Sequence, residues 1–420
     1  MLFKQSLLLW SQLFDEVVWL DSNQHKNEYS SFDVLVAVDG LTALSTDYSN
    51  AFENLKEYQS QTKDWIFGYL SYDLKNDVES LTSNNSDGLE FPDLYFFQPK
   101  KIIQIIDNQV SFIYLNMVAD EVESDFLEIS NFTINRKEAP KKDSNVHIKM
   151  RIFKDEYFKR VEKMLSHIHK GDIYEANFCQ EFYMEDFVID PVHIYNKLNQ
   201  ISRPPFATYF KSFDKYLLCA APERYLKKTG AKLVSQPIKG TAPRSLDKKM
   251  DARLKSELQT DQKERSENIM IVDLVRNDLS KSALKGSVLV EELCEVYSFD
   301  QVHQMISTIS SMVSEDKNPV DVLRETFPMG SMTGAPKISA MKIIEELESF
   351  KRGLYSGAVG YFTPDSDFDF NVVIRSILYN KTNKYLSYAV GSAITEKSIP
   401  AKEYEECLLK AKAMRQVLEE

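Results

Sequence analysis

A lysine beside a glycine, after a β-type run, is the residue whose setting best suggests chemistry. The segment 232–238 is rich in apolar and β-branched residues, and Lys239 follows it directly, succeeded by Gly240 and Thr241. This pattern predicts a strand that stops at the glycine, where a fold can hold one side chain rigidly over a cleft. Burial there would lower the pKa of Lys239 and free its amine as a nucleophile or base. The alternative is an ordinary surface lysine, which the spacing alone favours.

Two pairs of glutamates are the next candidates. Glu264 and Glu267 are three residues apart in one predicted helix, and Glu403 and Glu406 repeat that spacing in another. Residues at i and i+3 share a helix face, so two such pairs could hold a divalent cation between them. Carboxylate ligands favour a hard cation such as Mg²⁺. The alternative is two solvated acidic faces, which are common in proteins.

Glycine and basic residues gather in the C-terminal part of the chain. The segment 330–337, Gly-Ser-Met-Thr-Gly-Ala-Pro-Lys, precedes an amphipathic helical pattern, and such helix starts attract anions. It lacks the Lys-Ser/Thr of a Walker loop, so nucleotide binding is not expected. Arg375 ends an apolar run and is either paired structurally or aimed at a carboxylate. Lys410, one turn beyond Glu406, could meet an anionic ligand in the same space.

Composition narrows the class of protein. The 420 residues are 43% hydrophobic, and 63 acidic against 51 basic residues give a net charge of −12. No basic tract interleaved with aromatic residues could follow a phosphate backbone, so no nucleic-acid partner is expected. The four cysteines form no C-x-x-C pair, which favours reduced, mostly buried thiols.

The N-terminus does not resemble a targeting segment. Residues 1–10 contain one cation and a short apolar core without a small-residue cleavage site. No uninterrupted run approaches the roughly 20 apolar residues that span a bilayer. We therefore expect a cytoplasmic protein with no membrane contact.

The order of predicted elements indicates an α+β protein. Mixed strands and helices occur without regular βαβ alternation. The predicted parts are a β-rich N-terminal region (1–134), a polar linker (135–145) and a catalytic region (148–420). Within the last we expect a helix over 153–168 ending at Gly171, strands over 173–241 with a turn at Thr229-Gly230, a helical block over 247–281, a strand at 287–290, a helix ending near Pro328 and a helix over 401–418.

Seven segments in order resemble the chorismate-utilising enzyme family, over about 150 to 418. They are Ala221 to Tyr225, Pro237 to Thr241, Glu267 to Leu279, Gly330 to Lys337, Tyr355 to Tyr361, Ile374-Arg375 and Pro400 to Ala413. The resemblance implies two β-sheets packed face to face with helices outside and the active site between them. It also implies one intertwined unit, in which the linker is a surface excursion.

Within this family the residue at position 239 separates activities. The aminodeoxychorismate branch resembles this chain in having lysine there, whereas anthranilate synthases usually have alanine. The implied reaction is amination of chorismate to 4-amino-4-deoxychorismate, for 4-aminobenzoate and folate synthesis. Lys239 would attack the ring at C2 while Glu223 protonates the leaving C4 hydroxyl, and ammonia would then add at C4 and expel the lysine. The alternatives are an anthranilate synthase component I, aminating C2, and a catalytically silent binding scaffold.

The same resemblance implies the remaining site residues and partners. Mg²⁺ would be held by Glu267 and Glu406, with Glu264 and Glu403 reaching it directly or through water. A glutamine amidotransferase subunit would supply ammonia, since no Gly-Cys-Gly nucleophile signature is present. The residues implied in substrate binding are Gly240, Thr241, Tyr355, Arg375, Gly391, Ser392, Ala393 and Lys410, with His303 as an orienting residue.

Three departures from the family pattern matter. Gly391-Ser392-Ala393 stands where relatives often have Gly-Gly-Gly or Gly-Ala-Gly, so the close backbone approach at Ala393 is not carried over. Isochorismate and salicylate synthases have a general-base lysine where this chain has Glu175, which disfavours their water-activating chemistry. The tryptophan-binding Leu-Leu-Glu-Ser segment is not evident, its nearest counterpart being 18–22, so tight tryptophan feedback is not expected.

Overall fold

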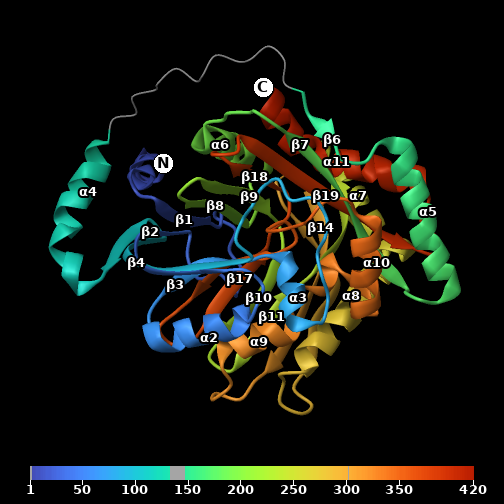
Figure 1. Ribbon diagram of the computed structural model, residues 1–420, viewed down its shortest axis with the longest axis horizontal. Helices are drawn as coiled ribbons and strands as arrows, with labels where there is room; N and C mark the ends of the chain where they lie inside the picture. The colour runs from blue at the N-terminus through green and yellow to red at the C-terminus, as the bar shows by residue number, and fades with distance from the viewer. Residues whose placement is uncertain (1, 133–146, 301) are drawn as a thin grey trace.

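Antiparallel strands joined into one hydrogen-bonded network form the body of the protein, and helices cover its outside (Figure 1). The computed structural model describes residues 2–132, 147–300 and 302–420. The α+β class is confirmed. The linker predicted at 135–145 lies outside these ranges.

The network has two arms that meet at two long, paired strands, β2 (Val34–Thr46) and β4 (Leu94–Ile106). The β2 arm continues through β1 (Glu16–Asp21), β8 (Phe206–Ser212), β9 (Lys215–Ala221), β18 (Ser376–Asn380), β19 (Tyr385–Thr395) and β7 (Glu175–Met184). The β4 arm continues through β3 (Ile66–Leu70), β16 (Ala358–Phe362), β17 (Phe368–Val372), β10 (Arg224–Thr229), β11 (Lys232–Gln236) and β14 (Val302–Met312). The smaller strands are β5 (Gln109–Tyr114), β6 (Lys149–Met150), β12 (Ile238–Pro243), β13 (Leu289–Ser298) and β15 (Gly334–Ala335).

Alternation along the strands shows that the arms pack face to face. In β1, Val18 and Leu20 join a core that also contains Phe370 of the β4 arm, whereas Val17 and Trp19 join a second core beneath the helices. Successive strand side chains point to opposite faces, so the β2 arm is buried on both. The expected arrangement of two face-packed sheets is confirmed.

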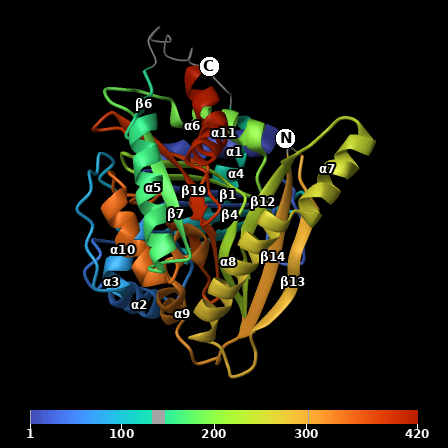
Figure 2. The same cartoon turned by 90° about the vertical axis from the view of Figure 1, so that its right-hand side faces the viewer.

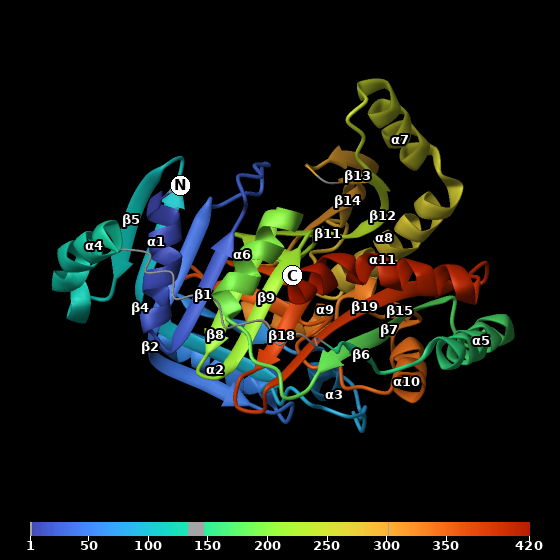
Figure 3. The same cartoon turned by 90° about the horizontal axis from the view of Figure 1, so that it is seen from above.

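Helices cover the outer faces of both arms. The second core receives α1 (Leu2–Trp10), α5 (Lys154–Lys170), α6 (Pro191–Ser202), α10 (Lys337–Leu347) and α11 (Pro400–Glu419). The first core receives α2 (Ala51–Thr62), α8 (Gln262–Ser280) and α9 (Pro319–Thr326). The second core also receives Ile129 of α4 (Val122–Asn131). The remaining helices are α3 (Lys75–Val78) and α7 (Lys248–Thr260), and α7 projects from the body (Figure 3).

Most of the predicted elements occur, with three informative differences. The segment 173–241, predicted as strands, also contains the helix α6. The helix over 153–168 is α5, which ends at Gly171 with φ of 83°, and β10 and β11 form the predicted hairpin. The helical block over 247–281 is two helices, because Asp261 ends α7 and caps the N-terminus of α8 with its side chain. The strand before Lys239 breaks at Pro237 and not at Gly240, so Lys239 lies inside β12 rather than at a strand end.

The N-terminal and C-terminal parts share the same sheets. β1 pairs with β8, and β3 pairs with β16, so strands from 1–134 are hydrogen-bonded to strands beyond 148. All four cysteines are free and buried, as the sequence predicts. In the described part of the chain, no helix combines the length and apolar character needed to cross a membrane.

A buried ion pair ties three of these elements together behind the glycine-rich segment. The guanidinium of Arg352 contacts the Glu348 carboxylate at 2.6 Å and donates to the carbonyl oxygens of Asn177 and Met332 at 2.7 Å each. Glu348 in turn accepts from the Cys179 amide at 2.8 Å. The pair therefore fixes β7 against the turn 330–332, and both side chains are about 98% buried or more.

We expect Arg352→Leu to lower the free energy of unfolding by about 3–5 kcal/mol, because it leaves the Glu348 carboxylate buried and unpaired. Urea denaturation measures this change. Arg415→Leu removes a partner from another i, i+4 pair, Arg415 with Glu419, whose side chains are 56% and 44% exposed. That control should cost no more than about 0.5 kcal/mol. Equal losses in the two variants would contradict the role given to Arg352.

Candidate active site

The bulge that carries Lys239 is set by β12 and its partner strand. β12 pairs with β14, and the register shifts between Ile238 and Thr241. Gly240 lies in this irregular stretch with φ of 89°, a conformation that favours glycine. A Cβ at Gly240 would lie 3.1 Å from Glu264 Oε2, so the glycine also lets β12 approach α8. Helix α8 runs beside β12 and β14 (Figure 2).

The amine of Lys239 lies inside the protein and faces carboxylates. Its side chain is 15% exposed, and Nζ lies 3.5 Å from Glu175 Oε1. Burial acts to lower the pKa of Lys239, but surrounding carboxylates outweigh it and raise the pKa above its ordinary value. The carboxylates are those of Glu175, Glu267, Glu406 and Glu223. The expectation of a lysine kept neutral by burial is therefore wrong: the residue rests as an ammonium.

Glu223 follows β9 and is almost completely buried, at 5% exposure. Burial raises the pKa of its carboxyl group to about 7, although a hydrogen bond from Ser331 and the charge of Lys239 both act to lower it. A carboxylic acid that keeps its proton near neutral pH is suited to general acid catalysis. The predicted role of Glu223 thus has a physical basis in its surroundings.

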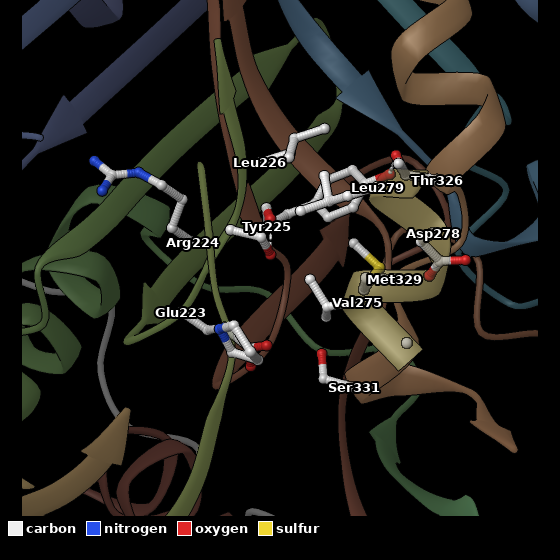
Figure 4. A pocket seen from close by; sticks show the side chains of 13 residues that line it. Glu223, Arg224, Tyr225, Leu226, Val275, Asp278, Leu279, Thr326, Met329 and Ser331 are labelled. Carbon is white, nitrogen blue, oxygen red and sulfur yellow. Dashed lines mark hydrogen bonds between the residues drawn. The ribbon is translucent and has the colours of Figure 1, made fainter. Parts of the chain in front are cut away.

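A cavity of about 340 Å³ opens beside Glu223. Figure 4 shows Glu223 and Ser331 at one end of it and Asp278 and Thr326 at the other. Lys239 does not line this cavity, so Glu223 is the predicted catalytic residue that the cavity reaches.

The two predicted glutamate pairs lie on α8 and α11, and their charges act on the same basic groups. Lys263 Nζ lies 3.7 Å from Glu267 Oε1. Burial acts to lower the pKa of Lys263, but Glu267, Glu403, Glu264 and Glu406 outweigh it and raise the pKa. Burial raises the pKa of Glu264, and that of Glu267 to about 7. The two helices therefore surround one space with more negative charge than lysines neutralise.

This space suits a divalent cation chemically, although the side chains are not gathered into a finished metal site. Glu267 Oε1 is buried without a hydrogen-bond partner, and the donors are all carboxylate oxygens, which Mg²⁺ prefers. Within 2–132, 147–300 and 302–420, no three His, Cys, Asp or Glu side chains come together closely enough to hold a metal.

A second group of predicted residues surrounds the C-terminal half of β19 and the middle of α11. Lys410 Nζ donates to the Gly391 carbonyl at 2.8 Å and pairs with Glu406 at 2.6 Å. Although burial opposes it, Lys410 lowers the pKa of Glu406. Arg375, with φ of 53°, donates to the Lys410 carbonyl at 3.5 Å, and burial lowers the pKa of its guanidinium. These cations are well placed to face an anion.

Gly391, Tyr355 and Ser392 are fixed by contacts with neighbouring elements. A Cβ at Gly391 would lie 2.7 Å from Cys179 Sγ, so glycine is needed for β19 to pack there. The Tyr355 hydroxyl lies 3.9 Å from the same sulfur. Ser392 donates to Glu403, which ties β19 to α11, while Ala393 pairs with Asn177 of β7 and is itself buried.

Two predicted substrate-binding residues do not fit this group. His303 is 1% exposed, and its ring nitrogens contact Ser298 at 2.9 Å and Asp251 of α7 at 3.0 Å. Its hydrogen-bonding capacity is used inside the protein, where it anchors α7. Thr241 is exposed.

Sequence reasoning missed three residues that the structure brings to the site. In the sequence, Glu175 stands out only as the absence of a lysine and Ser331 only as part of a glycine-rich segment, while Lys263 does not stand out. The i, i+4 spacing of Lys263 and Glu267 was the available signal, but it is common on exposed helices.

The counterpart of the tryptophan segment lines a different cavity. Leu20, Asp21 and Ser22 contribute to a space of about 530 Å³ between β1 and the 205–208 segment. The Asp21 carboxylate is already paired with Lys4 at 2.6 Å. The absence of tight tryptophan feedback stays a prediction.

Comparison with known proteins identifies the family. The model of the chorismate binding enzyme family matches residues 15–416, so the chain belongs to that family. It is 35% identical over 404 residues to a protein of Oryza sativa subsp. japonica named probable aminodeoxychorismate synthase, chloroplastic, covering 87% of this chain and 45% of the rice protein. It is 32% identical over 362 residues to anthranilate synthase component 1 of Thermus thermophilus, covering 84% and 77% of the two chains.

A solved structure agrees with this assignment. Anthranilate synthase component I from Streptococcus pneumoniae superposes with a TM-score of 0.80 at 25% identity, over 93% of this chain and 94% of that chain. The chain spans less than half the length of the rice relative, and relatives of similar identity carry two different reaction names. Family and fold are thus established, and the reaction must be argued from the site.

The raised pKa of Glu223 predicts how its replacement changes stability with pH. Below about pH 4.5 the carboxyl is protonated in both folded and unfolded chains, so it contributes no difference. Between about 4.5 and 7 only the unfolded chain releases the proton, and stability falls as pH rises. Glu223→Gln should therefore match the wild type at pH 4.5 and exceed its unfolding free energy by on the order of 3 kcal/mol at pH 8. Denaturant titrations at several pH values measure this, and a difference that grows towards low pH would contradict it.

Proposed function

We propose that this protein aminates chorismate to 4-amino-4-deoxychorismate, using ammonia from a glutamine amidotransferase subunit, in the synthesis of 4-aminobenzoate. The observation that carries the proposal is the amine of Lys239, held among four acidic side chains, one of which is the buried acid Glu223. Membership of the chorismate binding enzyme family and the name of the rice relative support the substrate and the reaction.

The lysine and the acid divide the chemistry between them. Nζ of Lys239, once deprotonated, attacks C2 of the ring, and the hydroxyl at C4 departs. Hydroxide is a poor leaving group, so Glu223 delivers its proton as the C–O bond breaks. Ammonia then bonds to C4 and the lysine leaves C2, which returns the enzyme to its starting form.

Anionic groups of the substrate are held by the C-terminal basic residues. Arg375 and Lys410 supply charge for a carboxylate, and the backbone at Gly391 positions Lys410 through its carbonyl oxygen. Tyr355, buried beside Cys179, orients the enolpyruvyl arm. In this proposal His303 acts through α7 rather than on the substrate.

A magnesium ion would be held by Glu267 and Glu406, with Glu264 and Glu403 direct or through water. When bound, it neutralises a substrate carboxylate and draws electron density from the ring. The protein's own part is to keep these glutamates on two facing helices. Lys263 now lies 3.7 Å from Glu267. When the ion binds, the Lys263 side chain must move away, or Glu267 must contact the lysine and the ion together.

The amination position distinguishes this proposal from its nearest rival. We expect the chain, given chorismate, Mg²⁺ and an ammonium salt, to yield 4-amino-4-deoxychorismate, identified by liquid chromatography with mass spectrometry. Lys239→Ala should reduce turnover by a factor of about 10² or more, because the nucleophile is lost. Lys232→Ala, at a half-exposed lysine of the adjoining strand, serves as the control.

Fluorescent anthranilate as the main product would overturn the proposal in favour of the rival family activity. Unchanged turnover in Lys239→Ala would exclude the lysine chemistry. If the wild type, Lys239→Ala and Lys232→Ala all fail to turn over chorismate with ammonium present, the result would support a binding scaffold instead.

Metal removal gives a separate test. We expect chelation with EDTA to abolish turnover and added Mg²⁺ to restore it, because two carboxylates of α8 and α11 bind the ion. Glu267→Gln should raise the Mg²⁺ concentration for half-maximal rate by about tenfold or more, since it removes one charged ligand. The control, Glu185→Gln, changes an exposed glutamate paired with Lys149. Full turnover in EDTA would contradict the proposal.

A further inference from the structure

Glu175, the first residue of β7, is a buried carboxylate that the proposed chemistry leaves without a task. Its side chain is 2% exposed, and Oε1 lies 3.5 Å from Lys239 Nζ. Its other oxygen, Oε2, is buried without a hydrogen-bond partner. A buried carboxylate that is only half satisfied costs stability, so its presence at this point calls for a functional explanation.

The backbone holds Glu175 firmly in place. It pairs with Thr395 of β19 on one side and with Ala335 of β15 on the other. A Cβ at Gly334 would lie 2.2 Å from the Glu175 carbonyl oxygen, so β15 packs closely against it. A side chain on so rigid a strand can be directed at one atom, which here is the lysine nitrogen.

The other carboxylates that act on Lys239 have different surroundings. Glu267 and Glu406 contact Lys263 and Lys410, respectively, and are the proposed ligands of the cation. Glu223 accepts a hydrogen bond from Ser331 and supplies the proton for the leaving hydroxyl. Glu175 forms its ion pair with Lys239 itself, so it is the carboxylate placed to exchange a proton with the lysine.

We propose that Glu175 is the base that removes a proton from the Lys239 ammonium so that the amine can attack the ring. This inference rests on the proposed function. The distance of 3.5 Å must shorten to about 2.6–3.2 Å for the transfer, a tightening that is common when a substrate binds. A base is needed here because the lysine rests as an ammonium, which has no lone pair to donate.

The proposed cycle balances. A proton moves from Nζ to a Glu175 oxygen, and the freed lone pair forms the bond to C2. The C1–C2 double bond shifts to C1–C6, the C5–C6 double bond shifts to C4–C5, and the C4 hydroxyl leaves as water with the Glu223 proton. When ammonia adds at C4 these shifts reverse, Nζ departs and recovers its proton from Glu175. Glu223 recovers its own proton from the new ammonium group.

Adduct formation without ammonia isolates the step. Wild-type protein is mixed with chorismate and Mg²⁺ for seconds and quenched in acid, and its mass is measured by intact-protein mass spectrometry. The adduct increases the mass of the protein by that of chorismate less one water. We expect Glu175→Gln, which keeps the shape and loses the base, to form it about 10² to 10⁴ times more slowly. Glu181→Gln is the matched control: a buried carboxylate on the same strand, paired with Arg151 and remote from Lys239 in sequence and register.

The outcomes separate this inference from the function beneath it. If the wild type forms no adduct, the lysine chemistry of the proposed function fails. If the wild type forms it and Glu175→Gln forms it as fast or faster, the function stands and the base is overturned; Glu175 would then only hold the lysine protonated. A slow Glu175→Gln beside a fast Glu181→Gln supports the base.

Chemical rescue distinguishes a base from a structural residue. An added carboxylate can replace a missing base, but it would not restore a purely structural contact. Glu175→Ala leaves room for a small carboxylate, and formate should raise its rate of adduct formation at least tenfold over chloride at equal ionic strength. Absence of rescue in a variant with wild-type melting temperature and chorismate binding would overturn the proposal. If the alanine variant does not fold, the adduct rate of Glu175→Gln decides.

Discussion

An excess of buried negative charge around one ammonium group is the constraint on which the site depends. Lys239 is surrounded by carboxylates from four separate elements, β7, the segment after β9, α8 and α11. Burying several carboxylates together is unfavourable unless cations or protons compensate for them. The structure shows both forms of compensation: the pKa of Lys239 is raised, and burial raises the pKa values of Glu223 and Glu267 to about 7. The negative charge that remains in this region would favour the binding of a cation and the acceptance of a proton.

The sheet network makes such a concentration of charge possible. β7 and β19 are paired along ten residues, while β12 belongs to the other arm and approaches α8 through Gly240. The Arg352 and Glu348 pair behind β7 fixes the turn 330–332 that presents Ser331 to Glu223. Groups that repel one another are thus held in place by strands and by a satisfied ion pair.

Local pattern allowed much of the fold and the membership of the site to be predicted. Periodicity identified α5, α10 and α11, and the hairpin turn identified β10 and β11, because these depend on near neighbours in sequence. The motif segments selected Lys239, Glu223 and both glutamate pairs. The charge state of Lys239 was predicted wrongly, because it depends on carboxylates up to 167 positions away that only the fold assembles. Glu175 and Ser331 were undervalued for the same reason.

His303 shows that a family resemblance can predict where a residue lies without predicting its contacts. Its ring is committed to Ser298 and Asp251, so in this chain it supports the projecting helix α7. The backbone of β14 places it across from Ala242, near the lysine bulge, so the family resemblance located the residue correctly but not its role. Proximity locates a residue, but its hydrogen bonds decide what it does.

The identity of the residue at 175 bears on which nucleophile the site can use. A lysine at this position would place a second ammonium beside Lys239, and the two would repel each other in a buried space. A glutamate instead attracts the Lys239 ammonium and offers it a proton acceptor. Water gains no comparable help from a carboxylate already occupied by the lysine, so the pair formed by β7 and β12 favours attack by the protein's own amine. In the proposed reaction the choice of nucleophile would follow from two side chains 3.5 Å apart, on strands that the fold brings together from opposite arms.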